Sequence, residues 1–238
     1  EKKPWSDIRV RKAVMLTTDQ RAAIDVAKLG DAAKGGFMSP GPWSIPLPDL
    51  EKLPGFRKPT EQDLAQAKKL LEEAGYPTGL KVNLLVRNLP DIVRVGVFAK
   101  DHLAKLGIEA ALQIKEQAAF QEARVTGAWE AMPYPILAVE LNEPDIILSR
   151  YLSDSPGNYG KYNNPAYDKL YEKQSQTLDA AERKKLILDM QRMLIEDPPA
   201  VPYFWDIRNE LSWPWVKGFR WLNHYVGDWD LENVWLAR

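Results

Sequence analysis

Two alternating stretches decide the fold: Leu80-Lys-Val-Asn-Leu-Leu-Val86 and Ile108-Glu-Ala-Ala-Leu-Gln-Ile114. The alternation of apolar and polar residues in each is typical of a half-buried β-strand. Residues 91–106 between them have a helical pattern that stops at Gly107. A strand, a helix and a strand in this order predict a right-handed crossover with the two strands parallel. We therefore predict an α/β lobe over residues 1–200, with a mixed, mainly parallel sheet.

Helical segments surround this unit, and several carry capping residues. Ser6 or Asp7 can cap a first helix, and Asp19 can cap a second. Thr60 begins a third helix, which Gly75 ends. Helices flanking a strand–helix–strand unit indicate the α/β class. Further helices are expected at 117–126, 145–152, 165–177 and 179–196, and further strands at 134–141, 201–205 and 210–213.

The composition excludes several classes of protein. The chain carries 32 basic and 33 acidic side chains, a net charge of −1, without the basic stripe that nucleic-acid binding requires. The absence of cysteine excludes disulfides and thiolate metal sites. No apolar run approaches the roughly 20 residues of a membrane-spanning helix. The opening Glu1-Lys2-Lys3-Pro4 contains neither a signal peptide nor an initiator Met, so we interpret it as a cut inside a longer protein.

Signals for catalysis are poor. The two histidines are His102 and His224, and His102 follows Asp101 on the expected polar face of a helix, where we predict a solvated ring. No histidine pair has the spacing of metal ligands on a helix, and neither a Gly-x-Ser-x-Gly elbow nor a phosphate loop occurs. We therefore expect no enzyme, no cofactor and no metal site. Two glycosidase acids at unrelated positions stay an alternative.

Segments along the whole chain resemble one family of proteins. They are Pro4-Trp5-Ser6-Asp7-Ile8-Arg9-Val10-Arg11-Lys12-Ala13-Val14, Leu141-Asn142-Glu143-Pro144-Asp145, Asn158-Tyr159-Gly160-Lys161-Tyr162-Asn163-Asn164-Pro165-Ala166-Tyr167-Asp168-Lys169-Leu170, and Pro199-Ala200-Val201-Pro202-Tyr203-Phe204-Trp205 followed by Trp215-Val216-Lys217-Gly218-Phe219. In this order and spacing, the chain resembles the C-terminal half of family 5 extracellular solute-binding proteins. These are the receptors of oligopeptide, dipeptide and nickel importers.

The resemblance implies a lobe of the periplasmic-binding-protein type II kind. Residues 1–205 would form the second ligand-binding lobe, and 206–238 would return towards an absent first lobe. The hinge crossings would lie at 1–4 and 201–205. Such a receptor is a bacterial periplasmic protein or a cell-surface lipoprotein, and a monomer at full length. Its partners would be a small-molecule or peptide-like solute and the membrane permease subunits of an ABC importer, not nucleic acid.

Glu140 is the residue at which this chain departs from the family's peptide receptors. Peptide-binding members have an Asp at this place, which pairs with the peptide's free amine, and a Trp three residues earlier. This chain has Glu140 and Leu137 there. A longer carboxylate can still bind a cation, but the loss of the Trp argues against an ordinary peptide. We predict that Glu140 points into the cleft near Asn158 and Tyr159; the alternative is a solvated loop acid.

Other candidate ligand contacts lie on a helix end and in loops. Arg124 occupies a place where peptide receptors present a basic residue, whose guanidinium could fork onto a carboxylate; the alternative is a surface arginine. Asn158 and Tyr159 lie in a glycine-flanked loop that often touches ligand in the family, or else they are loop scaffolding. The remaining candidates are aromatic residues beside Pro or Gly, for which core packing is the alternative: Trp129, Tyr134 and Trp43.

Ligand and function each keep alternatives open. The abundance of aromatic residues favours an oligosaccharide or another flat solute, and six tryptophans from Trp205 to Trp235 would pack against the absent lobe. The first functional hypothesis is the binding lobe of an importer receptor. The second is the ligand-sensing module of a transcription regulator, which an upstream helix-turn-helix would indicate. A carbohydrate-active enzyme is the third.

Overall fold

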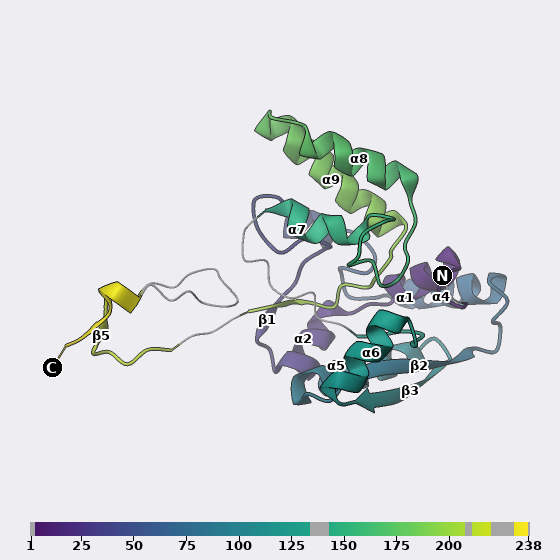
Figure 1. The fold of residues 1–238 in the computed structure, drawn as a ribbon. Helices are drawn as coiled ribbons and strands as arrows, with labels where there is room; N and C mark the ends of the chain where they lie inside the picture. The colour runs from purple at the N-terminus through teal and green to yellow at the C-terminus, as the bar shows by residue number, and fades with distance from the viewer. Residues whose placement is uncertain (1–2, 134–142, 208–210, 220–230, 238) are drawn as a thin grey trace.

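The computed structural model describes residues 3–133, 143–207, 211–219 and 231–237, and Figure 1 labels most of their elements. In chain order these elements are α1 (Ile8–Leu16), α2 (Gln20–Lys28), β1 (Ala32–Ala33), α3 (Leu47–Leu50), α4 (Glu61–Glu73), β2 (Leu80–Arg87), α5 (Pro90–Ala104), β3 (Ile108–Lys115), α6 (Gln117–Thr126), α7 (Pro144–Leu148), η1 (Ser149–Tyr151), α8 (Pro165–Ser175), α9 (Ala180–Glu196), β4 (Trp205–Asp206), β5 (Val216–Lys217), η2 (Leu231–Asn233) and β6 (Trp235–Leu236).

The predicted strand–helix–strand unit is confirmed. β2 and β3 pair in parallel over their full length, from Leu80 opposite Ile108 to Arg87 opposite Lys115. α5 connects them and packs on both strands. An isolated parallel bridge between Leu84 and Ala131 continues the pairing beyond β2. Two short antiparallel ladders, β1–β4 and β5–β6, make the described sheets mixed in direction, with the longest pairing parallel.

Two of the expected strands are placed differently. Of residues 201–205, only Trp205 belongs to a strand, since β4 begins there and pairs with β1. The described part of 210–213 forms no strand, and β5 lies a few residues later, at Val216–Lys217. In residues 201–204, the Pro202 carbonyl accepts a hydrogen bond from Gln20, and the Tyr203 hydroxyl contacts His102. The apolar residues there therefore reflect partial burial of the segment and not pairing in a β-ladder. The expected strand at 134–141 lies outside the described residues.

The capping predictions hold because they depend on local geometry. The Asp7 carboxylate accepts a hydrogen bond from the Arg9 amide at 2.9 Å, and Asp19 accepts one from the Ala22 amide at 3.0 Å. Thr60 and Asp63 form a reciprocal capping box at the start of α4. These bonds satisfy amides that a helix leaves free in its first turn, which fixes where each helix begins.

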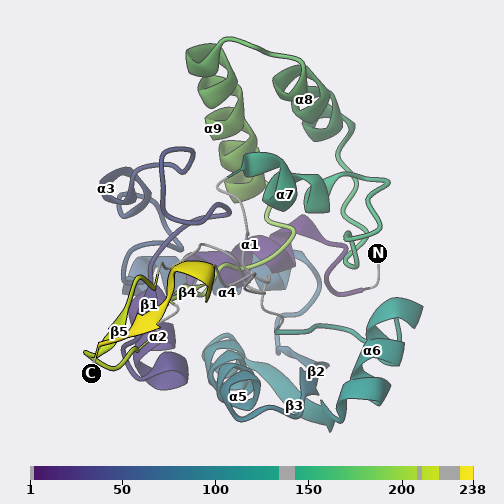
Figure 2. The ribbon, with the colours of Figure 1, turned by 60° about the vertical axis from the view of Figure 1, so that its left-hand side comes forward.

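Apolar side chains gather in two main cores. One lies where α1 and α4 cover the β2–α5–β3 unit and includes Val10, Leu71 and Val86. The other joins α7, α8 and α9 around Tyr167 and Met190. Figure 2 shows the α8–α9 pair at one end of the body and the parallel unit at the other, with α1 between them.

The C-terminal residues carry exposed tryptophans. Trp213 and Trp215 stack with ring centroids 4.7 Å apart, and Trp213 and Trp235 are 66% and 59% exposed. Figure 1 shows β5 extending away from the body, in the yellow-green part of the chain. Such side chains are normally buried, so this face has the character of a contact surface.

Candidate functional site

Three of the residues predicted to bind ligand form one cluster. Arg124 lies in the last turn of α6, which ends at Gly127 in the left-handed conformation with φ 71°. The Arg124 guanidinium lies over the Tyr159 ring, 4.6 Å from its centroid. The Trp129 indole N–H donates to the Arg124 carbonyl at 3.2 Å. Residues from α6 and from the loop before α8 thus meet.

This cluster combines a cation with aromatic faces. The side chains of Arg124, Trp129 and Tyr159 are each partly exposed, so they lie neither inside a core nor fully in solvent. Trp129 packs beside Leu85 and Phe120, which ties the cluster to the parallel strands. A guanidinium is attracted to the face of an aromatic ring, and its planar N–H edge matches a carboxylate in shape. The arrangement suits a solute with an anionic or flat polar group.

Asn158 supports the loop that presents Tyr159. Its side chain is buried, and its amide donates to the carbonyls of Leu152 at 3.0 Å and Tyr162 at 2.7 Å. Its carbonyl accepts from the Tyr162 amide at 2.9 Å. These internal bonds favour the scaffolding interpretation of Asn158, and they set the position of the neighbouring tyrosine.

Trp43 lies in a different cluster. Its ring lies over the Arg183 guanidinium, 5.4 Å from centroid to carbon, and its carbonyl accepts from Gln191 at 2.8 Å. Trp43 also packs against the core of α7, α8 and α9. The structure therefore connects Trp43 to the helical end of the molecule and not to the Arg124 cluster. Glu140 and Tyr134 lie outside the described residues.

No motif or spacing in the sequence indicated the ionic cluster around Arg183. Arg183, near the start of α9, pairs with Glu143 and lies 3.4 Å from Asp145, at the start of α7. The buried side chain of Gln174 accepts from Arg183 at 3.1 Å and donates to Asp145. These partners are separated by about 40 residues in the chain, so no local pattern could have indicated them. The cluster fixes the Glu143-Pro144 turn that follows the segment containing Glu140.

His102 corrects a prediction. Its place beside Asp101 on the helix predicts a solvated ring, but His102 is 2% exposed. Its Nε2 lies 2.9 Å from the Thr17 hydroxyl and its Nδ1 lies 3.2 Å from the Tyr203 hydroxyl. Burial lowers the pKa of His102 to about 4. α2 packs on α5, and Thr17 after α1 and Tyr203 after α9 cover the His102 ring.

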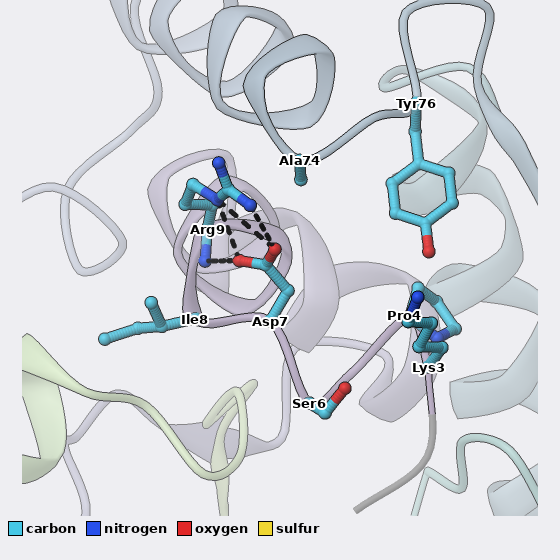
Figure 3. A pocket seen from close by; sticks show the side chains of 8 residues that line it. All are labelled: Lys3, Pro4, Ser6, Asp7, Ile8, Arg9, Ala74 and Tyr76. Atoms are coloured by element: carbon cyan, nitrogen blue, oxygen red, sulfur yellow. Dashed lines mark hydrogen bonds and ion pairs between the residues drawn. The ribbon is translucent and has the colours of Figure 1, made fainter.

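An open hollow of about 620 Å³ lies at the start of the chain, and Figure 3 shows its lining. Its charged groups are Lys3, Asp7 and Arg9; Asp7 and Arg9 pair with each other, and Arg9 also donates to the Glu73 carbonyl at 2.6 Å. The bond from Arg9 lowers the pKa of Asp7. Two of the three charged groups of the hollow therefore neutralise each other.

Within the described residues, no group of three or more His, Asp or Glu side chains could hold a metal ion. No helix in that part of the chain has the length and apolarity to cross a membrane.

Comparison with known proteins decides the family. Residues 1–159 match the model of the bacterial extracellular solute-binding proteins, family 5 Middle. The chain belongs to this family. It is 30% identical to the periplasmic oligopeptide-binding protein OppA of Escherichia coli over 98% of its length, and 29% identical to the periplasmic murein peptide-binding protein MppA of that organism over 92%.

Solved structures agree with this assignment. The structure of Haemophilus influenzae OppA in complex with the peptide RPPGFSPFR matches the whole chain with a TM-score of 0.81 at 27% identity, and the chain covers 47% of it. This confirms the periplasmic-binding-protein type II fold. The chain spans 42% of the Escherichia coli OppA sequence and 41% of MppA, so it corresponds to less than half of each.

The family is one of binding proteins rather than enzymes, which confirms that expectation. The relatives named above are periplasmic. The comparisons do not support the regulator or the carbohydrate-active enzyme.

Proposed function

We propose that this chain is the second lobe and C-terminal segment of the solute-binding component of a bacterial ABC importer. The single observation that carries the proposal is the stacking of Arg124 on Tyr159, since it presents an oriented cation on a partly exposed surface. Membership of a solute-binding family supports it. The ligand would be a small peptide-like solute; an oligosaccharide or another flat solute is the alternative.

Capture would proceed by closure of a first lobe over the Arg124 cluster. Closure removes water from the guanidinium and the aromatic faces, which strengthens each polar contact with the solute. Arg124 would bond an anionic group, and Tyr159 and Trp129 would supply the apolar walls. Asn158 would act indirectly, by holding the Tyr159 loop. An importer would then recognise the closed form.

Glu140 would supply the opposite charge. It lies three residues before Glu143, which the Arg183 cluster holds in place. A carboxylate there and a guanidinium at Arg124 would suit a solute with separated positive and negative groups. Tyr134 would line the same segment, and Trp43 would contribute at most from the helical end.

The division of the chain follows from the same proposal. Residues 1–205 would form the ligand-binding lobe, and 206–238 would return to a first lobe. The exposed Trp213, Trp215 and Trp235 side chains support this, because contact with a further part of the protein would bury them. The intact protein would be monomeric, would reside in the periplasm or be held at the cell surface as a lipoprotein, and would dock on permease subunits.

Binding by the intact protein tests the role of Arg124. Trialanine and a short oligosaccharide serve as probes in calorimetry. We expect trialanine to bind, and Arg124→Met to weaken binding by about 10- to 100-fold, the usual loss of a charged hydrogen bond. Arg21→Met is the matched control, since Arg21 is an exposed helical arginine paired with Asp25. Equal affinity in the Arg124 variant, or oligosaccharide binding alone, would contradict the peptide-like proposal.

Glu140→Gln tests the second charge. In the intact protein it should weaken binding of an amine-bearing probe such as trialanine by about 1–3 kcal/mol, because the variant keeps the shape but removes the charge. N-acetylated trialanine, which lacks the free amine, should bind wild type and variant alike. Unchanged trialanine affinity would assign Glu140 to the solvated loop.

A further inference from the structure

Residues 198–206, here called the exit segment, leave α9 and are tied to the lobe along their whole length. Arg11 donates to the Pro198 carbonyl at 3.0 Å, and Gln20 donates to the Pro202 carbonyl at 2.8 Å. The Trp205 indole donates to the Gly36 carbonyl at 3.0 Å, and Lys28 pairs with Asp206 at 2.7 Å. The exit segment therefore stays on the lobe through contacts with α1, α2 and the segment after α2.

His102 provides the central contact of the exit segment. Its ring lies between Thr17, at the end of α1, and Tyr203 of the exit segment. Phe98, one turn earlier on α5, packs edge-to-face on Tyr203 with centroids 5.2 Å apart. The hydroxyl–imidazole–hydroxyl chain thus crosses an aromatic interface.

The neighbours of His102 favour one tautomer. The Thr17 hydroxyl lies 3.2 Å from the Val14 carbonyl and 3.3 Å from that of Ala13, and either carbonyl can accept its single proton. With that proton on a carbonyl, the Thr17 oxygen accepts from His102, which places the proton of the neutral ring on Nε2. Nδ1 carries the lone pair and accepts from the Tyr203 hydroxyl.

We propose that neutral His102 holds the exit segment on the lobe through a hydrogen bond that is lost when the ring takes up a proton. A proton added at Nδ1 replaces the acceptor that Tyr203 requires with a donor. The Tyr203 hydroxyl must then turn away or the ring must leave the interface. Either change removes the central hydrogen bond of the exit segment.

The surrounding charges support this behaviour. Burial is the main cause that lowers the pKa of His102 to about 4, and Lys105 acts in the same direction. The Thr17 backbone and Asp19 oppose it. Burial also raises the pKa of Tyr203, so its hydroxyl keeps the proton that it donates to Nδ1. These are the groups that face the ring from α1, the start of α2, α5 and the exit segment.

The size of the effect is bounded by the two pKa values of the ring. A ring released to water would have a pKa near 6.5, whereas the pKa of the ring buried between Thr17 and Tyr203 is about 4. As the pH falls between these values, the released form takes up a proton first. Opening of the exit segment should therefore become more frequent by up to about 300-fold. If the proposed function holds, this loosens the link to residues 206–238.

Nuclear magnetic resonance of the intact protein tests this role of His102 without any ligand. The imidazole signal that disappears in His102→Gln identifies the ring. We expect Nε2 to be protonated at neutral pH and the ring to titrate below pH 5. Protonation on Nδ1 at neutral pH, or titration near 6.5, overturns the proposal.

Hydrogen exchange of residues 201–206 provides the second readout. After correction for intrinsic rates, wild-type protection should fall steeply between pH 6.5 and 4. In Tyr203→Phe, which keeps the ring but lacks the hydroxyl, protection should be lower at neutral pH and change less with pH. Wild-type protection that does not change with pH overturns the proposal, whether or not the variant folds.

Discussion

Single polar residues show how far burial changes what a side chain does. Asn158 was expected either to touch ligand or to hold its loop, and its three internal hydrogen bonds favour the second role. Tyr159, next in the chain, stacks on Arg124. A buried amide with every bond made inside the loop stabilises the loop, and the neighbouring residue presents its ring to the surface.

Asn158→Ala tests this division of roles. The substitution leaves the carbonyls of Leu152 and Tyr162 without their buried donor, so we expect a loss of about 2–3 kcal/mol in the free energy of unfolding. Chemical denaturation measures it. Asn163→Ala is the control, because the Asn163 bond to Ser153 is exposed, and it should change stability by less than about 0.5 kcal/mol. Equal effects would contradict the scaffolding role.

At the scale of elements, ionic contacts join helices that are far apart in the chain. Arg183 of α9 holds Glu143 and Asp145 at the start of α7, with Trp43 stacked on its guanidinium. Two carboxylates at a helix N-terminus are favoured by the helix dipole, but they repel each other without a cation between them. Arg183 therefore ties the start of α7 to α9.

Arg183→Met should lower the free energy of unfolding by about 1–2 kcal/mol, since it leaves two half-buried carboxylates without their cation. Thermal and chemical denaturation measure the loss. Arg192→Met, on the same helix, removes only an exposed pair with Asp189 and should cost less than about 0.5 kcal/mol. A loss no larger than that control would show that packing alone joins α7 to α9.

The start of α4 depends on an acid that stays ionised. Arg57 and Thr60 hold the pKa of Asp63 at about 2, below its ordinary 3.8. Because the folded pKa is the lower one, this stabilisation is complete above pH 3.8 and is lost as the pH falls towards 2.

Asp63→Asn should therefore cost about 2 kcal/mol of unfolding free energy at pH 7, and the difference from wild type should shrink near pH 2. Glu61→Gln, an exposed acid in the same helical turn, serves as the control. A difference that does not change with pH would show that Asp63 acts through packing and not through its charge.

At the scale of the whole molecule, the length of the chain and its exposed aromatic side chains both bear on ligand binding. It spans 42% of the Escherichia coli OppA sequence, and tryptophans that proteins normally bury are exposed near its C-terminus. The Arg124 cluster lies on a partly exposed surface rather than in an enclosed cavity. Ligand affinity in such receptors depends on burial between two lobes.

The 238-residue chain alone should therefore bind solute weakly. Calorimetry with trialanine should give a dissociation constant above about 1 μM, because one side of the solute stays in water. The intact protein provides the comparison. Submicromolar binding by the chain alone would contradict the two-lobe account.

Local features were predictable because their causes lie within a few residues. The parallel β2–β3 pairing follows from a helix too long for a hairpin, and the caps at Asp7, Asp19 and Thr60 follow from side chains that reach amides two or three residues away. The family was likewise predictable, since its motifs are short and stand in a fixed order.

Only the tertiary structure decided which polar side chains meet. His102 lies on a helix whose own pattern predicts an exposed ring, yet Tyr203, 101 residues later, covers it. The Arg124–Tyr159 and Arg183–Glu143 contacts also join residues that are far apart in the chain. Hydrophobic periodicity tells which face of an element is buried against its neighbours, but the partner of a single polar group depends on how the whole chain closes on itself.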